Sequence, residues 1–403
     1  MTLAIDNDAN AFQSDADLSL TPGDGCNVEI DGCTWPSTSG GDGTVLVTDA
    51  SGVLSWQIRS GQIVVDREYY ISTAGSDVTG DGTSSYPWAT LGRALELLRG
   101  YRIASNATVT LILSDGAYTV STPFVLDLPD GQQVKITGQN AYTKLMSSVQ
   151  SSSGSSGTWA IVINLNNVSN IAVGDYVLIT GASGGSNPAL MEGCHEVTDV
   201  DSGNSRITVA SKARSASVPS DAVAATVKAL KTRLVCSSVG FEMGAGASVQ
   251  AIDKLVLVGP GTGVADSAGI RAGVSGALPA TVSCNQHSLG IVNFAYGIWS
   301  YNGSVVLGEY VVISGCNVGV CAQVGGYAVI NSGVVSGCGT GVYPLGDGVV
   351  NLVSTHVVGN DVGVYVLSNA YAYAVNTTFF GNATDCSPAV NTFGNNNSLI
   401  TFA

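Results

Sequence analysis

The chain has few side chains able to transfer protons, because only three of its 403 residues are histidines. Two residues still form a candidate pair: His287 and Glu309 are 22 positions apart, and Asn331 follows after another 22. On stacked coils of that length the imidazole would lie beneath the carboxylate, where the two could act as acid and base. A glycosidase needs a second carboxylate about 5–9 Å from the first, and this column holds none. A partly exposed ion pair, or a contact with another copy of the chain, is therefore the alternative.

Most other acidic residues of this region occupy positions where bends are expected. Asp347 aligns at the same spacing with Gly303 and Gly325, and Asp361 aligns with Gly339, which indicates structural roles in turns.

Glu192, His195 and Glu196 have a spacing that would suit a metal site on a helix, but the sequence around them is typical of a strand. Their side chains would then alternate between two faces, so we expect structural roles for them. No Cys-x-x-Cys spacing, phosphate-binding glycine loop or nucleophile elbow is recognisable. The sequence thus predicts neither a metal site nor a cofactor.

The elements that would position these groups come from a sequence repeat in the last third of the chain. Three columns of residues recur at every twenty-second position, which is strong internal evidence for a solenoid. They are Gly297-Ile298, Gly319-Val320, Gly341-Val342 and Gly363-Val364; Ile291, Ile313, Val335, Val357 and Phe379; and Cys316, Cys338, Asn360 and Asn382. At about 3.3 Å per residue, a repeat of this length can close a coil of three short strands, with coils stacked about 4.8 Å apart. Because the signature of leucine-rich repeats is absent, we predict a right-handed parallel β-helix whose apolar columns fill the core. The Asn members of the last column could form an amide ladder between coils.

Alternation along each strand then identifies the outer surface. With the Ile298 column inside, two rows face outward: Trp299, Cys321, Tyr343 and Tyr365, and then Tyr301, Gln323, Leu345 and Leu367. A continuous apolar and aromatic stripe of this kind usually marks a partner. It is interpreted either as the seam of a homotrimer or as a stacking platform for sugar rings.

Composition excludes several classes of partner and of fold. Charged residues are only 11% of the chain and Gly numbers 51, which favours an all-β protein over a helical one. The net charge of −15 argues against nucleic acid, which needs basic patches. No apolar run approaches about 18 residues, so membrane insertion is not expected, and the N-terminus lacks the pattern of a secretory signal. The nine cysteines are an odd number and most lie in strand-like sequence, which indicates buried thiols after synthesis in a reducing cytoplasm.

Four domains are predicted along the chain. Residues 1–66 form a small N-terminal module, which contains a β-hairpin with strands near 43–49 and 52–56. Residues 67–151 form the first coils and a short helix, Leu91 to Leu98, that caps the end of the stack. Residues 152–229 form a small β-barrel-like insertion, and 230–403 form the main β-helix.

Three stretches carry a resemblance to known proteins. The segment from Trp35-Pro36 to Leu54-Ser55-Trp56 resembles a short module of phage tail fibres and spikes. The segment from Tyr70-Ile71-Ser72 to Pro87-Trp88 is similar to the entry segment of pectate-lyase-like β-helices in phage tailspikes. Gly174-Asp175-Tyr176-Val177-Leu178-Ile179, followed by Glu192 to Val197, resembles a barrel insertion of such spikes.

The resemblance implies a bacteriophage tailspike or tail fibre protein. It would be a homotrimer in the virion, attached through its N-terminus to a tail adaptor or baseplate protein. Its β-helix would bind host cell-surface polysaccharide or lipopolysaccharide. Two alternatives stay open: a depolymerase that cleaves the polysaccharide as a glycoside hydrolase or lyase, and a purely structural tail component.

Overall fold

The computed structural model describes residues 61–185, 187–215, 224–244, 248–273, 281–389 and 399–402, and four short strands before them. The chain forms two compact units, Met1–Gly61 and Gln62–Ala403. In the first unit β1 (Glu29–Ile30) pairs with β2 (Cys33–Thr34), and β3 (Thr44–Thr48) pairs antiparallel with β4 (Leu54–Ile58). The second pairing confirms the predicted hairpin strands; the turn between them lies outside the described residues.

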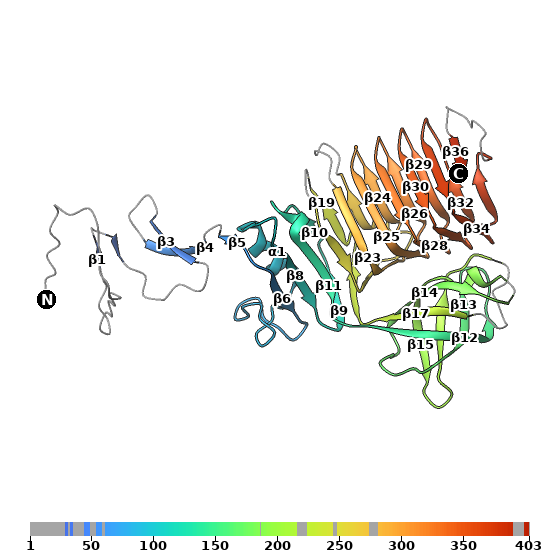
Figure 1. The fold of residues 1–403 in the computed structure, drawn as a ribbon, viewed down its shortest axis with the longest axis horizontal. Coiled ribbons are helices and arrows are strands. Elements are labelled where there is room, and N and C mark those ends of the chain that lie inside the picture. The colour runs from blue at the N-terminus through green and yellow to red at the C-terminus, as the bar shows by residue number, and fades with distance from the viewer. Residues whose placement is uncertain are drawn as a thin grey trace. The chain divides into compact units, whose positions relative to one another are not determined.

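Most of the second unit is a stack of coils whose strands form three parallel sheets (Figure 1). In order across each sheet, the strands are as follows. The eight-stranded sheet comprises β10 (Phe124–Leu126), β19 (Phe241–Met243), β22 (Ala268–Ala272), β24 (Tyr296–Tyr301), β26 (Val318–Gln323), β29 (Thr340–Leu345), β32 (Val362–Tyr365) and β35 (Thr384–Ser387). The four-stranded sheet comprises β20 (Ala251–Asp253), β11 (Val134–Gly138), β8 (Val109–Leu113) and β6 (Arg67–Ile71).

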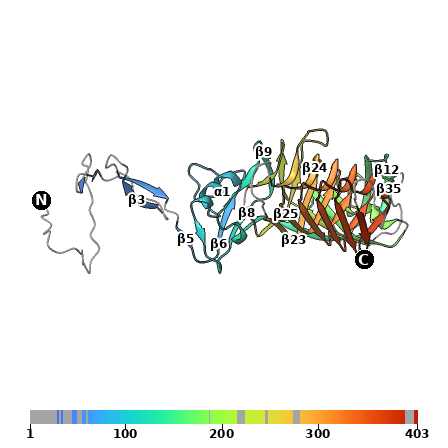
Figure 2. The same cartoon turned by 90° about the horizontal axis from the view of Figure 1, so that it is seen from above.

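The third sheet has twelve strands. Its main path is β36 (Leu399–Phe402), β33 (Tyr371–Val375), β30 (Val349–Val353), β27 (Tyr327–Asn331), β25 (Val305–Ser314), β23 (Thr281–Val292), β21 (Leu255–Val258), β18 (Thr232–Cys236) and β9 (Gly116–Val120), and its branch is β28 (Val334–Ser336), β31 (His356–Val358) and β34 (Thr378–Phe380). Seen from above, strands of successive coils lie side by side along the horizontal axis (Figure 2).

The register of the sheets shows why the sequence repeats. Ile298 pairs with Val320, Val320 with Val342 and Val342 with Val364, so each partner lies one full repeat further along the chain. All four side chains are buried, and the Ile291-to-Phe379 column stacks in the same register. Apolar residues therefore recur where the coil turns them inward, and this arrangement fits a parallel β-helix.

Asn360 and Asn382 form the amide contact that the sequence predicts. The Nδ2 of Asn360 donates to the Oδ1 of Asn382 at 2.9 Å and to the carbonyl of Val335 at 3.1 Å. The Oδ1 of Asn360 accepts from the backbone N–H of Cys338 at 2.8 Å. The same column therefore changes from buried thiols to a hydrogen-bonded amide ladder along the stack.

The one described α-helix, α1 (Leu91–Arg99), closes one end of the apolar core. Leu91, Ala94, Leu95 and Leu98 are buried, which confirms the predicted amphipathic pattern. The hydroxyl of Thr90 accepts from the backbone N–H of Arg93 and caps the helix. Beside the helix, β5 (Gln62–Ile63) pairs with β7 (Arg102–Ile103). No helix in the described ranges is long and apolar enough to cross a membrane.

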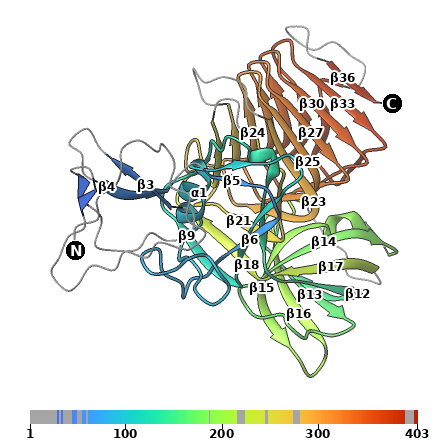
Figure 3. The ribbon, with the colours of Figure 1, turned by 60° about the vertical axis from the view of Figure 1, so that its left-hand side comes forward.

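Six antiparallel strands form a closed barrel on one flank of the coils (Figures 1 and 3). Around the barrel they are β12 (Ala141–Ser153), β13 (Trp159–Leu165), β16 (Arg206–Ser211), β15 (Gly193–Asp201), β14 (Tyr176–Ser183) and β17 (Ala224–Leu230). The predicted barrel-like insertion is thus present as a barrel. Its first strand begins at Ala141, before the predicted bound at residue 152, because β12 is one long strand that runs to Ser153.

Candidate functional site

The outer face of the eight-stranded sheet carries a cluster of five rings, which we term the aromatic surface. It consists of Tyr296, Trp299 and Tyr301 on β24, Tyr343 on β29 and Tyr365 on β32. All five side chains are half-buried, whereas the Ile298 column between them points into the core. The constant register of the coils brings these residues, which are far apart in the chain, onto one face.

The rings contact one another in pairs. Tyr296 stacks on Trp299 with ring centroids 4.5 Å apart, and Tyr301 meets Trp299 edge-on at 6.2 Å. Tyr343 and Tyr365 stack at 5.4 Å with nearly parallel planes, 10° apart. Each stacked ring covers one face of its neighbour, so a ligand would reach ring edges and the faces left open. Indole Nε1 of Trp299 donates to Oε1 of Gln323 at 3.3 Å, which orients the indole.

Cys321 lies in the predicted row, paired with Trp299 on one side and Tyr343 on the other. Its register agrees with the prediction, but its side chain is fully buried and so is not part of the exposed surface. Two large aromatic neighbours flank the small side chain and shield it from solvent. Burial raises the pKa of this thiol to about 12, so it stays protonated at neutral pH.

A second outer row flanks the first. Tyr301 pairs with Gln323, Gln323 with Leu345, and Leu345 bridges to Leu367, as alternation predicts. All four side chains are half-buried. The two rows together form a largely apolar strip with one amide group, and whether this strip binds sugar or another copy of the chain stays a prediction.

The candidate pair His287 and Glu309 is not aligned as the sequence suggests. Glu309 pairs with Asn285 on the preceding coil and with Asn331 on the following one. The cause is a register shift between Asn285 and Leu289. Before the shift, Asn285 pairs with Glu309, 24 positions further along the chain; after it, Leu289 pairs with Val311, 22 positions further along. The placement of His287 beneath Glu309 is therefore wrong. The side chain of His287 lies outside the described residues, and a catalytic role for either residue stays a prediction.

An ionisable pair with a fully buried carboxylate, which the sequence does not reveal, lies where the barrel meets the coils. Glu192 follows the 3-10 turn Pro188–Met191, and its fully buried carboxylate accepts from Nδ1 of His356 on β31. The other carboxylate oxygen accepts from the backbone N–H of Ala182 at 2.8 Å. The contact with Glu192 raises the pKa of His356 above its usual value. The two residues are 164 positions apart, so no local pattern could have predicted the pair.

His195 and Glu196 have separate environments, as strand alternation predicts. His195 is buried, its Nε2 donates to the carbonyl of Met191 at 3.0 Å, and burial lowers its pKa to about 4. Glu196 is exposed. Among the described residues no three His, Cys, Asp or Glu side chains gather as a metal site.

Other contacts fasten the barrel to the coils. Arg214 forms an ion pair with Asp361 at 2.6 Å and also donates to the carbonyl of Gly337. The hydroxyl of Ser314 accepts from the backbone N–H of Cys194 at 2.8 Å and contacts the hydroxyl of Ser336 at the same distance. The polar groups of this junction therefore serve to hold the two parts together.

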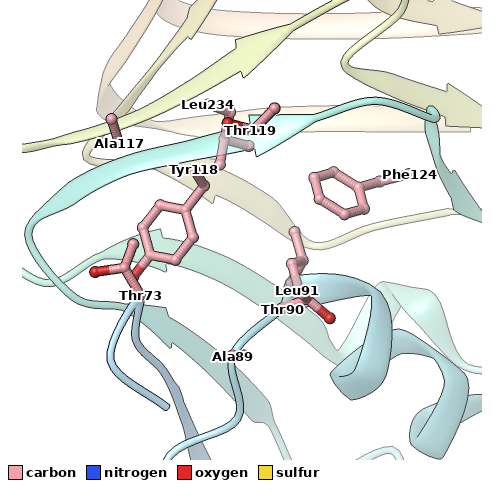
Figure 4. A pocket seen from close by; sticks show the side chains of 9 residues that line it. All are labelled: Thr73, Ala89, Thr90, Leu91, Ala117, Tyr118, Thr119, Phe124 and Leu234. Carbon is pink, nitrogen blue, oxygen red and sulfur yellow. The ribbon is translucent and has the colours of Figure 1, made fainter. Parts of the chain in front are cut away.

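A cavity of about 220 Å³ lies beside the start of α1 (Figure 4). Phe124 and Leu91 line one part of it, and Tyr118 and Thr73 another. The Tyr118 hydroxyl already donates to the carbonyl of Ile71 at 3.0 Å. The cavity offers no acid–base pair or charged group among its lining residues, so it gives no sign of catalysis.

Comparisons with known proteins add little. No family model matches the chain, and no curated protein matches its sequence. Among solved structures it is similar to the Gp54 tailspike of Acinetobacter baumannii bacteriophage AP22, solved in complex with A. baumannii capsular saccharide. The identity is 12%, the match covers 67% of this chain and 53% of that one, and the TM-score is 0.20. The chain thus spans about half the length of that tailspike. A likeness this low does not establish a shared fold, so the chain's own geometry must support any function.

Proposed function

We propose that this chain is a bacteriophage tailspike that attaches the virion to host cell-surface polysaccharide or lipopolysaccharide. The aromatic surface carries the proposal: five half-buried rings lie on one parallel sheet, beside the amide of Gln323. Aromatic rings with a few polar groups among them suit the apolar faces and the hydroxyls of sugars. Because each coil is held by the next, the rings keep their spacing without a ligand, which lowers the entropic cost of binding.

The assembly we propose is a homotrimer of right-handed, pectate-lyase-like β-helices in the phage tail. The unit Met1–Gly61 would dock on a tail adaptor or baseplate protein, as the resemblance of its sequence implies. The outer face of β25, β27, β30 and β33 carries a second, largely apolar area that is distinct from the aromatic surface. This area supports the proposed contact between copies of the chain. Its residues include Val305, Leu307, Tyr327, Val329, Val349, Tyr371 and Tyr373. Sedimentation showing a monomer would remove the trimer from the proposal.

The test is a pull-down of the purified full chain on envelope polysaccharide from the host bacterium, followed by size analysis of the glycan. Retention of the chain with a glycan of unchanged length supports attachment, whereas shortened glycan identifies a depolymerase. Failure of the purified trimer to bind leaves a structural tail component. The double substitution Trp299→Ala and Tyr343→Ala should abolish retention. Tyr86→Ala should not, because this exposed tyrosine lies in the loop between β6 and α1, outside the aromatic surface. If the glycan is shortened, unchanged cleavage by Glu309→Gln would dismiss Glu309 as a catalytic group.

A further inference from the structure

The basic residues are distributed unevenly along the chain. All 15 lysines and arginines lie at or before Arg271, so residues 272–403 contain none. The same stretch contains four acidic residues, namely Glu309, Asp347, Asp361 and Asp385. The coils that carry the aromatic surface therefore have no lysine or arginine of their own.

The nearest basic side chain in the eight-stranded sheet is already paired. Arg271 on β22 lies in the same outer row as Trp299, directly next to it in register. Its Nη2 donates to Oε2 of Glu242 on β19 at 3.0 Å, and the two side chains are 23% and 17% exposed. The pair is electrically neutral, so an anion approaching Arg271 would also meet the partly buried carboxylate of Glu242.

The barrel supplies basic groups only to a different part of the coils. Arg214 is paired with Asp361, and Lys228 donates to the hydroxyl of Ser288. The stem of Lys212 lies over Gly315 at the bend before β26. These contacts belong to the barrel junction, and among the basic side chains named here only Arg271, paired with Glu242, lies beside one of the five rings.

We infer that the aromatic surface binds an uncharged polysaccharide and discriminates against glycans that carry carboxylate, phosphate or sulfate groups; this inference rests on the proposed function. A bound anion must exchange its water for charge-assisted hydrogen bonds, which arginine or lysine usually supplies. A chain of net charge −15 also repels a polyanion before contact. The groups available here, the amide of Gln323 and the tyrosine hydroxyls, can hydrogen-bond to sugar hydroxyls instead. Burial raises the pKa values of Tyr296 and Tyr343, so their hydroxyls remain neutral donors.

The experiment measures retention of the purified full chain on an array of bacterial capsular and O-antigen polysaccharides of known composition. We expect every retained glycan to lack acidic groups. Between about 20 and 300 mM NaCl, retention should change less than about twofold, because no ion pair with the ligand is formed or screened. Trp299→Ala and Tyr343→Ala should each weaken retention by a factor between about two and about ten. Tyr86→Ala is the matched control and should leave retention unchanged.

Several results would overturn the inference in distinguishable ways. Retention of an acidic glycan that is lost when its carboxylates are chemically reduced would show that the charge is recognised. Retention unaffected by both ring substitutions would place binding elsewhere on the chain. If both ring substitutions dissociate the oligomer in sedimentation while glycan retention per chain persists, the surface is a contact between copies. Absence of retention on every glycan would refute the proposed function itself, and with it the inference.

Discussion

The pair formed by Glu192 and His356 predicts how firmly the barrel is held to the coils. The substitution His356→Ala removes the imidazole and leaves a fully buried carboxylate whose one remaining donor among the described residues is the backbone N–H of Ala182. Breaking a buried ion pair from one side costs about 3–5 kcal/mol. The side chain of His356 is 34% exposed, however, so water can reach part of the vacated space. We therefore expect a smaller destabilisation of the junction, about 1.5–3 kcal/mol.

Glu192→Gln provides the matched comparison, because glutamine keeps the shape of the side chain and an oxygen for the N–H of Ala182. This variant removes the buried charge, and His356 can then remain neutral. The expected loss is about 1 kcal/mol, the worth of one hydrogen bond. In the double variant no charge is left unpaired. It should therefore be more stable than His356→Ala alone, although it carries one more substitution.

Amide hydrogen exchange of the full chain, read by mass spectrometry over β15 and β31, measures opening of the junction directly. A loss of about 1.5–3 kcal/mol corresponds to exchange about 10- to 150-fold faster in these peptides. Exchange in β6 and β8, remote from the pair, serves as the internal control. Exchange in β15 that changes less than about twofold in His356→Ala would refute the reasoning. So would a double variant that opens more readily than His356→Ala.

Three further predictions follow from the same contacts and from the buried columns. The pKa of His356 is raised, so the stability it adds is complete below about pH 6.5 and falls as pH rises through its folded-state pKa; NMR titration of the ring should show that pKa falling in Glu192→Gln. Asn360→Ala should destabilise the coils by about 2–4 kcal/mol, because three hydrogen bonds of a buried amide are lost. Asn360→Cys should cost less, since the column holds cysteine on the two preceding coils. Equal losses for the two variants in equilibrium or kinetic urea denaturation would contradict this prediction. Cys386 is half-buried and Cys321 fully buried, so a thiol reagent near neutral pH should modify Cys386 before Cys321, which peptide mapping can check.

The sequence predicts the features of this chain that repeat. The core columns of the coils follow from the constant period, because residues that stack in register must be alike in character. The helix Leu91–Arg99 follows from its apolar spacing and from Thr90 at its start. Both depend on local pattern, and both are confirmed.

Features that depend on a change of register or on distant packing were not predictable. An irregularity in β23 ends the strict period between Asn285 and Leu289, so extrapolating the repeat upstream placed the wrong residue beneath Glu309. Alternation identifies the face on which Cys321 lies, but only its larger neighbours determine that it is covered. The contact between Glu192 and His356 needs the barrel to dock against β31, and nothing near either residue in the sequence specifies that docking.

The constant register of the coils also constrains how such a chain can change. Deleting or inserting one whole repeat removes or adds one layer and leaves every remaining column in phase. Insertion or deletion of a single residue within a strand has the opposite effect, because each side chain beyond it in that strand moves to the other face and core residues meet solvent. Corners at Gly315, Gly337, Gly359 and Gly381 all adopt positive φ, between 62° and 66°, so every layer bends at an equivalent place. Recombination between equivalent corners would therefore lengthen or shorten the stack by whole layers while preserving its cross-section.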